Sequence, residues 1–418
     1  MKTESTSKDI LYISHDGMTD SLGQSQVLPY LCGLSKLGYR FHLISLDKEE
    51  KFNTLSTTIY SICKEHGISW HPVKYSKKPP VFNTLYDLYR MRKIAIKLNK
   101  EFSFDMIHCR GYLPTLIAQS LKDKWEIPLT FDIRGFWINE RVDGNIWNLK
   151  NPIFNLIYST LKKREKTLFS NSETVISLTR KAIPVIHQIQ GGEIKTQLTE
   201  VIPTCVDTDY FSVKNINQDK RNQLIEKYNI KQSDFVLSYL GSLSTWYLPD
   251  EMFDFFKRLL IKKPDAKFLI ITQDDHEPYK ALAVKKGIPL SHIILIAAIR
   301  SEVPTLLSLS NASLFFIKPA FSKIASSPTK LAELLSMQIP VICNGGIGDT
   351  EEIVRQSDTG IICNEFNDSA YDQAIEEFFN NKNLTNGERL REKSIELFGL
   401  KMGVMKYAAV YKKTMHQE

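Results

Sequence analysis

The sequence predicts an α/β fold with two doubly wound parallel sheets. Short apolar segments of strand length alternate with longer segments whose apolar residues repeat at helical spacing, which is the pattern of βα units around a parallel sheet. The strand segments are almost wholly apolar, as expected for strands that are buried on both faces. The pattern runs twice along 418 residues, a length that suggests two or three domains of ordinary size.

Each series of strand segments defines one expected sheet. The first series comprises residues 10–14, 40–45, 68–73, 104–109, 128–133, 174–178 and 200–203. The second comprises residues 235–241, 267–272, 292–297, 312–317, 340–344 and 359–363. Three helical segments without a further strand follow, at 368–381, 385–398 and 400–415.

The boundary between the two series lies in residues 202–220, where Pro, Thr, Asp and Asn replace any periodicity and indicate a linker. We therefore expect an N-terminal domain over 1–205, a C-terminal domain over 206–395, and a last helix in 396–418 that returns to the first domain. Ligands of doubly wound sheets bind outside the carboxyl ends of the strands, so the site motifs should cluster there.

Composition excludes several classes of protein. With 43% hydrophobic and 24% charged residues, the chain is typical of folded globular proteins. Its polar start does not resemble a signal peptide, and no apolar run is long enough to span a bilayer. The six cysteines form no C-x-x-C pair, which argues against disulfides or zinc, and no D-x-D motif or His/Asp cluster suggests another metal. We expect a cytoplasmic protein without metal or cofactor.

The formal charge of +7 comes from local basic segments at 74–80, 89–100 and 161–166. Such segments are usually solvated helix faces. Alternatively, they contact anionic phospholipid or a polyprenyl phosphate, which would place the protein peripherally at the inner membrane face. No nucleic-acid-binding motif accompanies the charge, so nucleic acid is not an expected partner.

A first candidate motif follows the first strand, where Gly23 precedes a helical segment. Backbone N–H groups near Gly23 could bind an anion at the start of that helix. A glycine in this place is also a common steric solution for a tight loop, and both interpretations stay open.

The strongest motif lies in residues 317–363, where a loop of small residues leads into a helix. Ser326, Ser327 and Thr329 flank Pro328 at the expected helix start, and exposed N–H groups at such a start attract phosphate. Glu333 lies one turn into the helix in an apolar context. This context favours a buried, functional carboxylate over a solvated surface residue.

Two segments resemble motifs of glycosyltransferase family 4, a large family of retaining enzymes. VIPTCVDTDYF (201–211) is similar to its interdomain hinge, and SSPTKLAE (326–333) with PVICNGG (340–346) is similar to its C-terminal signature. The resemblance covers nearly the whole chain. It implies a GT-B fold, in which two Rossmann-like domains face each other across a cleft and the C-terminal helices cross back. It also implies that Glu333 accepts hydrogen bonds from the ribose of a nucleotide-sugar.

Three departures from the family pattern indicate a variant subfamily. Ala325 stands where the family has the first acid of its E-x7-E pair. The turn GSLSTWY (241–247) has Ser242 and Tyr247 at two positions that are basic in the family, and Arg134-Gly135 replaces a His-Gly pair. Because a desolvated diphosphate needs positive charge, other cations must replace the missing ones, and Lys318 is one residue near the motif strands that qualifies.

The predicted site residues fall into three groups. Arg134, Lys323 and Lys330 are expected to stabilise the phosphate of the nucleotide-sugar as the sugar is transferred. The donor is expected to contact Gly23, Gly241, Ser242, Tyr247, Arg300, Ser326, Ser327, Thr329 and Glu333. The acceptor side is expected to include His108, Arg110, Asp132, Glu140 and Asp143. For His108, the alternative of a satisfied core histidine stays open.

The predicted function is transfer of a sugar from a nucleotide-sugar to a hydroxyl of a saccharide or lipid-linked acceptor, with retention, in cell-surface polysaccharide or glycoconjugate synthesis. A nucleotide-sugar 2-epimerase and a non-catalytic nucleotide-binding subunit of a polysaccharide complex are the alternatives. The base, the sugar and the number of donor phosphates stay open, and the missing basic positions leave room for a CMP-sugar with one phosphate.

Overall fold

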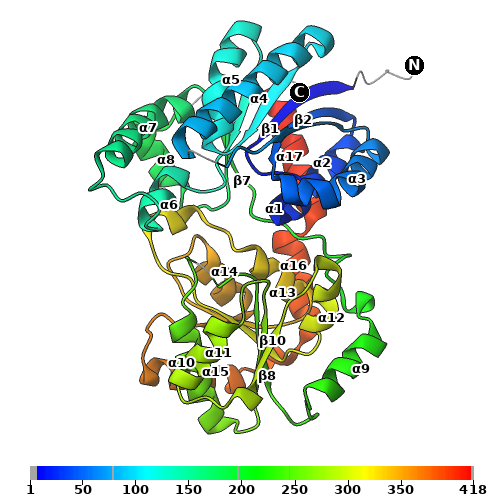
Figure 1. Cartoon of the computed structure of the whole chain (residues 1–418), viewed down its shortest axis with the longest axis vertical. Coiled ribbons are helices and arrows are strands. Elements are labelled where there is room, and N and C mark those ends of the chain that lie inside the picture. The colour runs from blue at the N-terminus through cyan, green and yellow to red at the C-terminus, as the bar shows by residue number, and fades with distance from the viewer. Residues whose placement is uncertain (1–6, 78–79, 195–196, 244, 416–418) are drawn as a thin grey trace. The chain divides into compact units, whose positions relative to one another are not determined.

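The computed structural model describes residues 7–77, 80–194, 197–243 and 245–415. Contacts between Cα atoms divide the chain into two compact units (Figure 1). The first unit comprises Met1–Cys205, Phe321–Ser326 and Leu400–Glu418, and the second comprises Val206–Ala320 and Ser327–Gly399. Every segment that the sequence predicts as a strand overlaps a strand of one of the two sheets.

The first unit contains a seven-stranded sheet in which all strand pairs are parallel. Its spatial order is β3-β2-β1-β4-β5-β6-β7. The strands are β1 (Lys8–Ser14), β2 (Tyr39–Asp47), β3 (Ser69–Lys74), β4 (Met106–Arg110), β5 (Leu129–Asp132), β6 (Thr174–Ser177) and β7 (Leu198–Val201). The order reverses between β1 and β4, and crevices at such reversals bind ligands in doubly wound folds.

Helices cover both faces of this sheet (Figure 1). Its helices are α1 (Ser21–Gln26), α2 (Leu28–Ser35), α3 (Glu49–Glu65), α4 (Pro80–Phe102), α5 (Tyr112–Trp125), α6 (Trp137–Asp143), α7 (Pro152–Ser170), α8 (Ile183–Gln190) and α17 (Leu400–Thr414). One apolar cluster joins α2 and α17 to the sheet, and another joins α4 and α5 to it. The alternation of strand and helical periodicity in the sequence thus gives a sheet with one layer of helices on each face.

The second unit contains a six-stranded parallel sheet of order β10-β9-β8-β11-β12-β13. Its strands are β8 (Val236–Leu240), β9 (Lys267–Ile271), β10 (Ile293–Ile296), β11 (Ala312–Phe315), β12 (Val341–Cys343) and β13 (Gly360–Ile362). Its helices are α9 (Gln218–Lys227), α10 (Pro249–Lys262), α11 (Glu277–Lys285), α12 (Val303–Leu307), α13 (Thr329–Ser336), α14 (Thr350–Ser357), α15 (Asp368–Asn380) and α16 (Gly387–Phe398). One apolar cluster spans the unit.

The unit boundaries differ in two places from the expected domains 206–395 and 396–418. Residues 396–399 group with the second unit, because they finish α16, and the first unit resumes at Leu400. The short segment Phe321–Ser326 groups with the first unit. Its Ala325 is fully buried in an apolar cluster that includes Phe131 and Phe136. This loop therefore packs with the first unit, although the residues before and after it in the sequence belong to the second.

The C-terminal helix α17 packs on α2 and β7 within the first unit. Gly403 allows the close approach, because a Cβ atom there would lie 2.7 Å from Cys205 Sγ and 2.9 Å from Tyr30 Cε1. None of the helices in the described part of the chain combines the length and the apolar character that crossing a bilayer requires.

Candidate active site

Glu333 is the buried carboxylate of the second unit. It lies in α13, and its side chain is 12% exposed, so its predicted burial is confirmed. Arg300 Nη1 lies 3.7 Å from Glu333 Oε1. Burial raises the pKa of Glu333 to about 7, although Arg300 and Lys330 act to lower it. Half-ionised near neutral pH, this carboxyl group can accept hydrogen bonds from a ligand hydroxyl.

Lys330 lies one turn before Glu333 and holds its ammonium group between two aromatic rings. Its Nζ donates a hydrogen bond to Tyr239 Oη at 2.9 Å. The same atom lies 4.0 Å from the ring centroid of Tyr239 and 3.7 Å from that of Tyr247. Burial lowers the pKa of Lys330 well below its usual value, and Glu333 only partly opposes this effect. A ligand anion would therefore favour the charged form of this amine.

The turn after β8 places Gly241 beside Lys330. Gly241 has a φ of +108°, and a Cβ atom there would lie 3.6 Å from Lys330 Nζ. Tyr239 Oη donates to the carbonyl of Ser242, and Asp274 accepts hydrogen bonds from Ser242 Oγ and the Leu243 amide. The turn is thus held rigidly against α13, and positive charge reaches it from Lys330.

Arg300 adds a second cation from the start of a short 3₁₀ helix, Arg300–Glu302. Its guanidinium carbon lies 5.3 Å from the ring centroids of both Tyr210 and Phe211. The side chain is 37% exposed, so part of its hydrogen-bonding edge can reach a ligand. The two rings attract the guanidinium group and restrict where it can lie.

The loop before α13 contains Ser326, Ser327 and Thr329, whose hydroxyl groups are predicted to lie at the start of the helix. Pro328 is the N-cap residue and has extended backbone, and Thr329 is the first helical residue. Ser326, Ser327 and Thr329 are half-buried. Pro328 has no side chain that could cap the helix. Capping by the neighbouring hydroxyls stays a prediction. Ser326 belongs to the first unit, whereas Ser327 belongs to the second.

Arg134 is the central charged residue of the first unit. It follows β5 with a φ of +54°, and its side chain is 11% exposed. Its Nη1 lies 3.7 Å from Asp132 Oδ2, and its Nη2 donates a 3.5 Å hydrogen bond to Gln26 Oε1. Arg134 Nε and Nη1 find no hydrogen-bond acceptor among the residues that the structure describes. Buried donors without acceptors are costly, and a ligand oxygen would satisfy them.

Asp132 and Arg110 end neighbouring strands, as the sequence predicts, and face each other in register. Burial acts to raise the pKa of Asp132, but Arg134, His108 and Arg110 hold it at about 2. Arg110 Nε donates a 2.8 Å hydrogen bond to Asp16 Oδ2. The carboxyl edge of this sheet thus carries alternating charges, of which Arg134 has the unsatisfied donors.

His108 is fully buried and belongs to the core, the second of the two interpretations of this residue. Its ring stacks on Tyr12, and its Nδ1 atom is hydrogen-bonded to Tyr411 Oη at 2.8 Å. Tyr407 Oη donates to Asp132 Oδ2 at 2.7 Å. Both tyrosines come from α17, which therefore stabilises the inner side of the charged edge.

Lys323, Glu140 and Asp143 form a structural clamp. Lys323 Nζ donates to Glu140 Oε1 at 2.8 Å, and the Ser322 amide donates to Asp143 Oδ2 at 2.9 Å. Lys323 was expected to act on phosphate and Glu140 on the acceptor, but each has its charge compensated by the other. These contacts join the Phe321–Ser326 segment to α6, and the predicted ligand roles of Lys323 and Glu140 stay predictions.

Two other predicted residues are Gly23 and Lys318. Gly23 is buried inside α1, where a Cβ atom would lie 2.2 Å from the carbonyl oxygen of Gly17. The neighbouring Gln24 amide donates to Asp20 O, so the steric interpretation of Gly23 accounts for the structure. Lys318 is half-buried, and its amide donates to Trp246 O.

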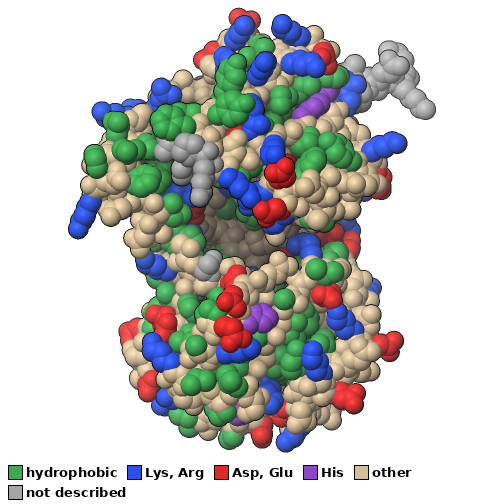
Figure 2. Space-filling view, viewed as in Figure 1, with side chains coloured by type: hydrophobic (Ala, Val, Ile, Leu, Met, Phe, Trp, Pro, Cys, Tyr) green, Lys and Arg blue, Asp and Glu red, His purple; other side chains and the backbone are tan. Residues whose placement is uncertain are grey.

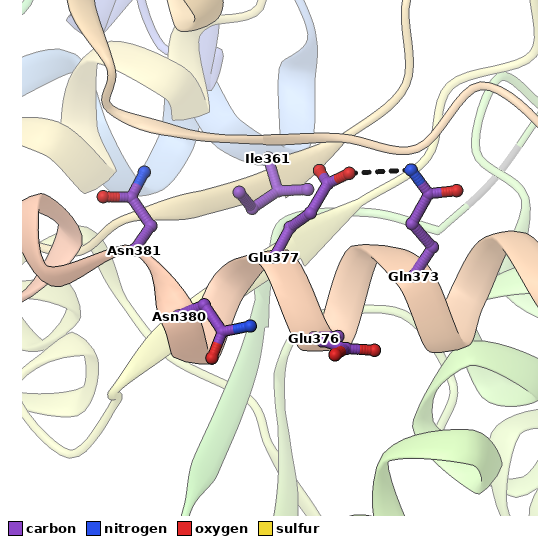
Figure 3. A pocket seen from close by; sticks show the side chains of 6 residues that line it. All are labelled: Ile361, Gln373, Glu376, Glu377, Asn380 and Asn381. Atoms are coloured by element: carbon purple, nitrogen blue, oxygen red, sulfur yellow. Dashed lines mark hydrogen bonds between the residues drawn. The ribbon is translucent and has the colours of Figure 1, made fainter.

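A separate surface hollow of about 550 Å³ runs along α15 beside β13 (Figure 3). Its lining consists of Ile361, Gln373, Glu376, Glu377, Asn380 and Asn381. Gln373 Nε2 donates to Glu377 Oε1 at 2.8 Å across one turn of the helix. Carboxylates and amides without a cation are unsuited to a phosphate group, so this hollow does not compete with the Lys330 region as a donor site.

Aromatic residues are the main site feature that sequence reasoning missed. Tyr239, Tyr210 and Phe211 line the two cations of the second unit, and Tyr407 and Tyr411 support Asp132 and His108. Tyr210 and Phe211 end the hinge motif, which could have drawn attention to them. Within the described ranges, no group of three or more His, Cys, Asp or Glu side chains is arranged to hold a metal ion.

Residues 220–396 match the model of the family "Glycosyl transferases group 1". This match contains Gly241, Arg300, Lys330 and Glu333, the residues that the second unit brings together. A search of curated proteins found no match. The narrower resemblance to family 4 stays a prediction.

Solved structures with the same fold include a glycosyltransferase from Rickettsia africae. Its TM-score is 0.72 at 17% identity, over 99% of this chain and 100% of that chain. HepE of Anabaena, solved in complex with UDP and glucose, has a TM-score of 0.69 at 12% identity, over 97% and 100% of the two chains. A putative UDP-N-acetylglucosamine 2-epimerase from Listeria monocytogenes has a TM-score of 0.61 at 12% identity, over 99% and 98%. The predicted fold, two Rossmann-like parallel-sheet domains of GT-B type, is confirmed.

Proposed function

We propose that this chain is a retaining glycosyltransferase that transfers a sugar from a nucleotide-sugar to an acceptor hydroxyl. The observation that carries the proposal is the group of Lys330, Glu333 and Arg300 beside the Gly241 turn, inside the segment that matches glycosyl transferases group 1. Two cations and one buried carboxylate are the charges that a phosphate next to a ribose needs.

We assign Glu333 to the ribose hydroxyls and Lys330 to the phosphate. The amine of Lys330 is desolvated, and the structure records Tyr239 Oη as its hydrogen-bond acceptor among the described residues. An arriving phosphate oxygen would accept a further hydrogen bond from it. Arg300 is held by two aromatic rings and can present a fixed donor pair to a second oxygen. Together they would replace the two basic side chains that the Ser242–Tyr247 turn does not supply.

In this mechanism the leaving phosphate gains negative charge as the glycosidic bond breaks. A cation that is already in place stabilises that charge without reorganisation. Retention is taken from the resemblance to family 4. A carboxylate at position 325 is not required, and Ala325 is fully buried against aromatic side chains, where a charge would be costly.

Arg134 is proposed to hold a second anionic or hydroxyl group in the first unit. Its unsatisfied Nε and Nη1 donors support this role. The proposed acceptor is a saccharide or lipid-linked saccharide of cell-surface polysaccharide or glycoconjugate synthesis, and the proposed location is the cytoplasm. No metal or cofactor is assigned a role.

The epimerase alternative has one observation in its favour, which is that a putative 2-epimerase shares the fold. Because the likeness is at 12% identity, it does not distinguish the two reactions. An epimerase would release free nucleotide and a glycal intermediate, whereas a transferase forms a glycoside. A non-catalytic nucleotide-binding subunit would bind nucleotide without either product.

The test is a thermal-shift panel of UDP, GDP, ADP, dTDP and CMP, followed by incubation of the matching nucleotide-sugar with saccharide acceptors. One nucleotide should raise the melting temperature, since preferential binding stabilises the folded chain by about 2.7 kcal/mol at a ligand concentration of about 100 Kd. A response to CMP alone would indicate a donor with one phosphate. If none of the five raises the melting temperature, the proposal is wrong.

Lys330→Met tests the assigned cation. The substitution nearly conserves volume and removes a buried charge, so stability should stay equal or rise. Affinity for the responding nucleotide should fall at least about tenfold, which is the loss of one charge-assisted hydrogen bond. Lys285→Met removes an exposed lysine of the same unit and should leave affinity unchanged.

A further inference from the structure

Arg391 joins three parts of the second unit through its guanidinium group. It lies in α16, and its Nη1 donates a 2.9 Å hydrogen bond to the carbonyl of Phe211 and another of 2.9 Å to the carbonyl of Ser336. Its Nη2 donates to the carbonyl of Thr208 at 2.6 Å. Arginine presents its donors in a rigid planar fork, so one side chain can connect segments that lie far apart in the sequence.

Two of these carbonyls belong to the segment that holds Arg300. The guanidinium carbon of Arg300 lies 5.3 Å from the ring centroids of Tyr210 and Phe211. We call these two rings the aromatic platform. The Phe211 carbonyl accepts a hydrogen bond from Arg391 and a second one, of 2.6 Å, from Ser336 Oγ. The backbone of the platform is therefore fixed to α13 and α16.

The third carbonyl belongs to the last turn of α13, the helix that carries Glu333. Ser336 is the last residue of α13, and the carbonyls of a last turn have no partner within their own helix. A positive charge at this end also interacts favourably with the helix dipole. Arg391 thus ties the platform to the helix that places Glu333, and Arg300 Nη1 lies 3.7 Å from Glu333 Oε1.

Other contacts hold α13 on the second unit without Arg391. Ser394 Oγ of α16 donates a 2.9 Å hydrogen bond to the carbonyl of Ala332, and leucines of α13 belong to the apolar cluster of the unit. Loss of Arg391 should therefore displace the platform, and with it Arg300, more than it displaces Glu333.

The surface charges of the second unit are mixed in sign on the face that Figure 2 shows, where acidic and basic side chains lie next to one another. This face does not present the single-sign field that would attract a nucleotide from a distance. Affinity for a nucleotide would then depend on where individual cations are held, and Arg300 is one of the two cations that we assign to the donor.

We infer that Arg391 is a positioning residue of the proposed donor site, which fixes Arg300 beside Glu333 by binding the backbone of the aromatic platform. This role rests on the proposed function, in which Arg300 binds the donor phosphate and Glu333 the ribose. Arg300 also acts to lower the pKa of Glu333, so its position can be followed without any ligand.

Arg391→Met removes the three hydrogen bonds and keeps an unbranched side chain. Affinity for the nucleotide that stabilises the wild type should fall about tenfold, the loss of one well-placed charge-assisted hydrogen bond. Arg300→Met should lower it by a similar factor. In the Arg300→Met background, Arg391→Met should lower affinity by about twofold or less, because the residue through which it acts is gone.

Arg389→Met is the matched control. Arg389 lies in the same helix and donates to the carbonyls of Ser357, Asp358 and Asn383, of which Ser357 ends α14. Its loss should lower the free energy of unfolding as Arg391→Met does, but it should leave nucleotide affinity unchanged.

Arg391→Lys separates the charge of this residue from its geometry. A single ammonium group keeps the positive charge but lacks the fork that spans the carbonyls, so the variant should recover at most part of the lost affinity. If circular dichroism shows that Arg391→Met is unfolded, Arg391→Lys takes its place in the comparison with Arg300→Met.

A second measurement needs no nucleotide. The difference in free energy of unfolding between a chain with Glu333 and the same chain with Glu333→Gln follows the ionisation of Glu333, and in the wild type it should level off above about pH 7. Arg391→Met should move this upper limit to higher pH, because Arg300 no longer opposes protonation of the carboxyl group. Arg300→Met should do the same, and the double variant should show no further shift. Arg389→Met should leave the profile unchanged.

Three results would overturn the role of Arg391. Folded Arg391→Met binds the nucleotide as the wild type does, its loss of affinity adds in full to that of Arg300→Met, or Arg391→Lys recovers full affinity, which would show that charge alone is sufficient. If no nucleotide binds the wild type, the proposed function is wrong. An unshifted pH profile of Arg391→Met would then separately show that Arg391 does not position Arg300.

Discussion

Replacing Glu333 by glutamine should stabilise the empty protein in a pH-dependent way. Burial raises the pKa of Glu333 to about 7 from an ordinary 4.5, against the opposing effect of Arg300 and Lys330. A carboxyl group whose pKa is higher in the folded than in the unfolded chain favours folding below the unfolded value, and this contribution is lost as pH rises through about 7. The gap between the two values corresponds to about 3 kcal/mol.

Glu333→Gln keeps the size of the side chain and cannot ionise. Relative to the wild type, its free energy of unfolding should therefore rise by about 3 kcal/mol between about pH 4.5 and pH 8. Urea unfolding followed by circular dichroism across this range measures the difference. Glu352→Gln, at an exposed position of α14, should follow the wild-type profile. Parallel pH profiles for the wild type and Glu333→Gln would refute the argument that the buried carboxylate is costly.

The same variant tests the role of Glu333 in binding. If this carboxylate holds the ribose, Glu333→Gln should lose most of the nucleotide-dependent rise in melting temperature near pH 8, although the empty variant is more stable than the wild type. A variant that gains stability and keeps the full nucleotide response would show that Glu333 is a buried charge without a ribose contact. Stability and binding should move in opposite directions, as expected for a group retained for function.

Two further predictions concern the packing of α17 in the first unit. Tyr411→Phe removes the hydroxyl that is bonded to His108 Nδ1 and should lower the free energy of unfolding by about 1–3 kcal/mol, measured by urea unfolding; a loss below about 0.5 kcal/mol would mean that water replaces the hydroxyl. Gly403→Ala places a methyl group 2.7 Å from Cys205 Sγ and should cost about 1–3 kcal/mol. Adding Cys205→Ala should restore part of that loss, and strict additivity of the two changes would contradict the contact.

Much of the fold could be predicted because strand and helix periodicities are local. The apolar runs of the two sheets and the three final helices are visible in the sequence, and the structure has strands or helices at each of them. The helix start at Thr329 and the burial of Glu333 could also be predicted, because both depend on neighbours within one turn.

The partners of the site residues could not be predicted in the same way. Lys323 is predicted to act on the phosphate and Glu140 on the acceptor, and the sequence does not show that Lys323 donates a hydrogen bond to Glu140. His108 has its Nδ1 atom bonded to a tyrosine about three hundred positions away in sequence, in α17. Tyr247 is predicted to contact the donor, and the sequence gives no sign that its ring also packs against Lys330 Nζ. Each of these contacts joins segments that share no local pattern.

For this protein, residue order along the chain was sufficient to predict two parallel sheets, the linker between them and the motif that holds Glu333. Those features follow from backbone hydrogen bonding and from which face of each element is apolar. Which cation lies beside Gly241, and which donors of Arg134 lack an acceptor, depended on side chains meeting through space. Charge compensation and desolvation act over a few ångströms in any direction, so they are not encoded in the periodicity of one segment.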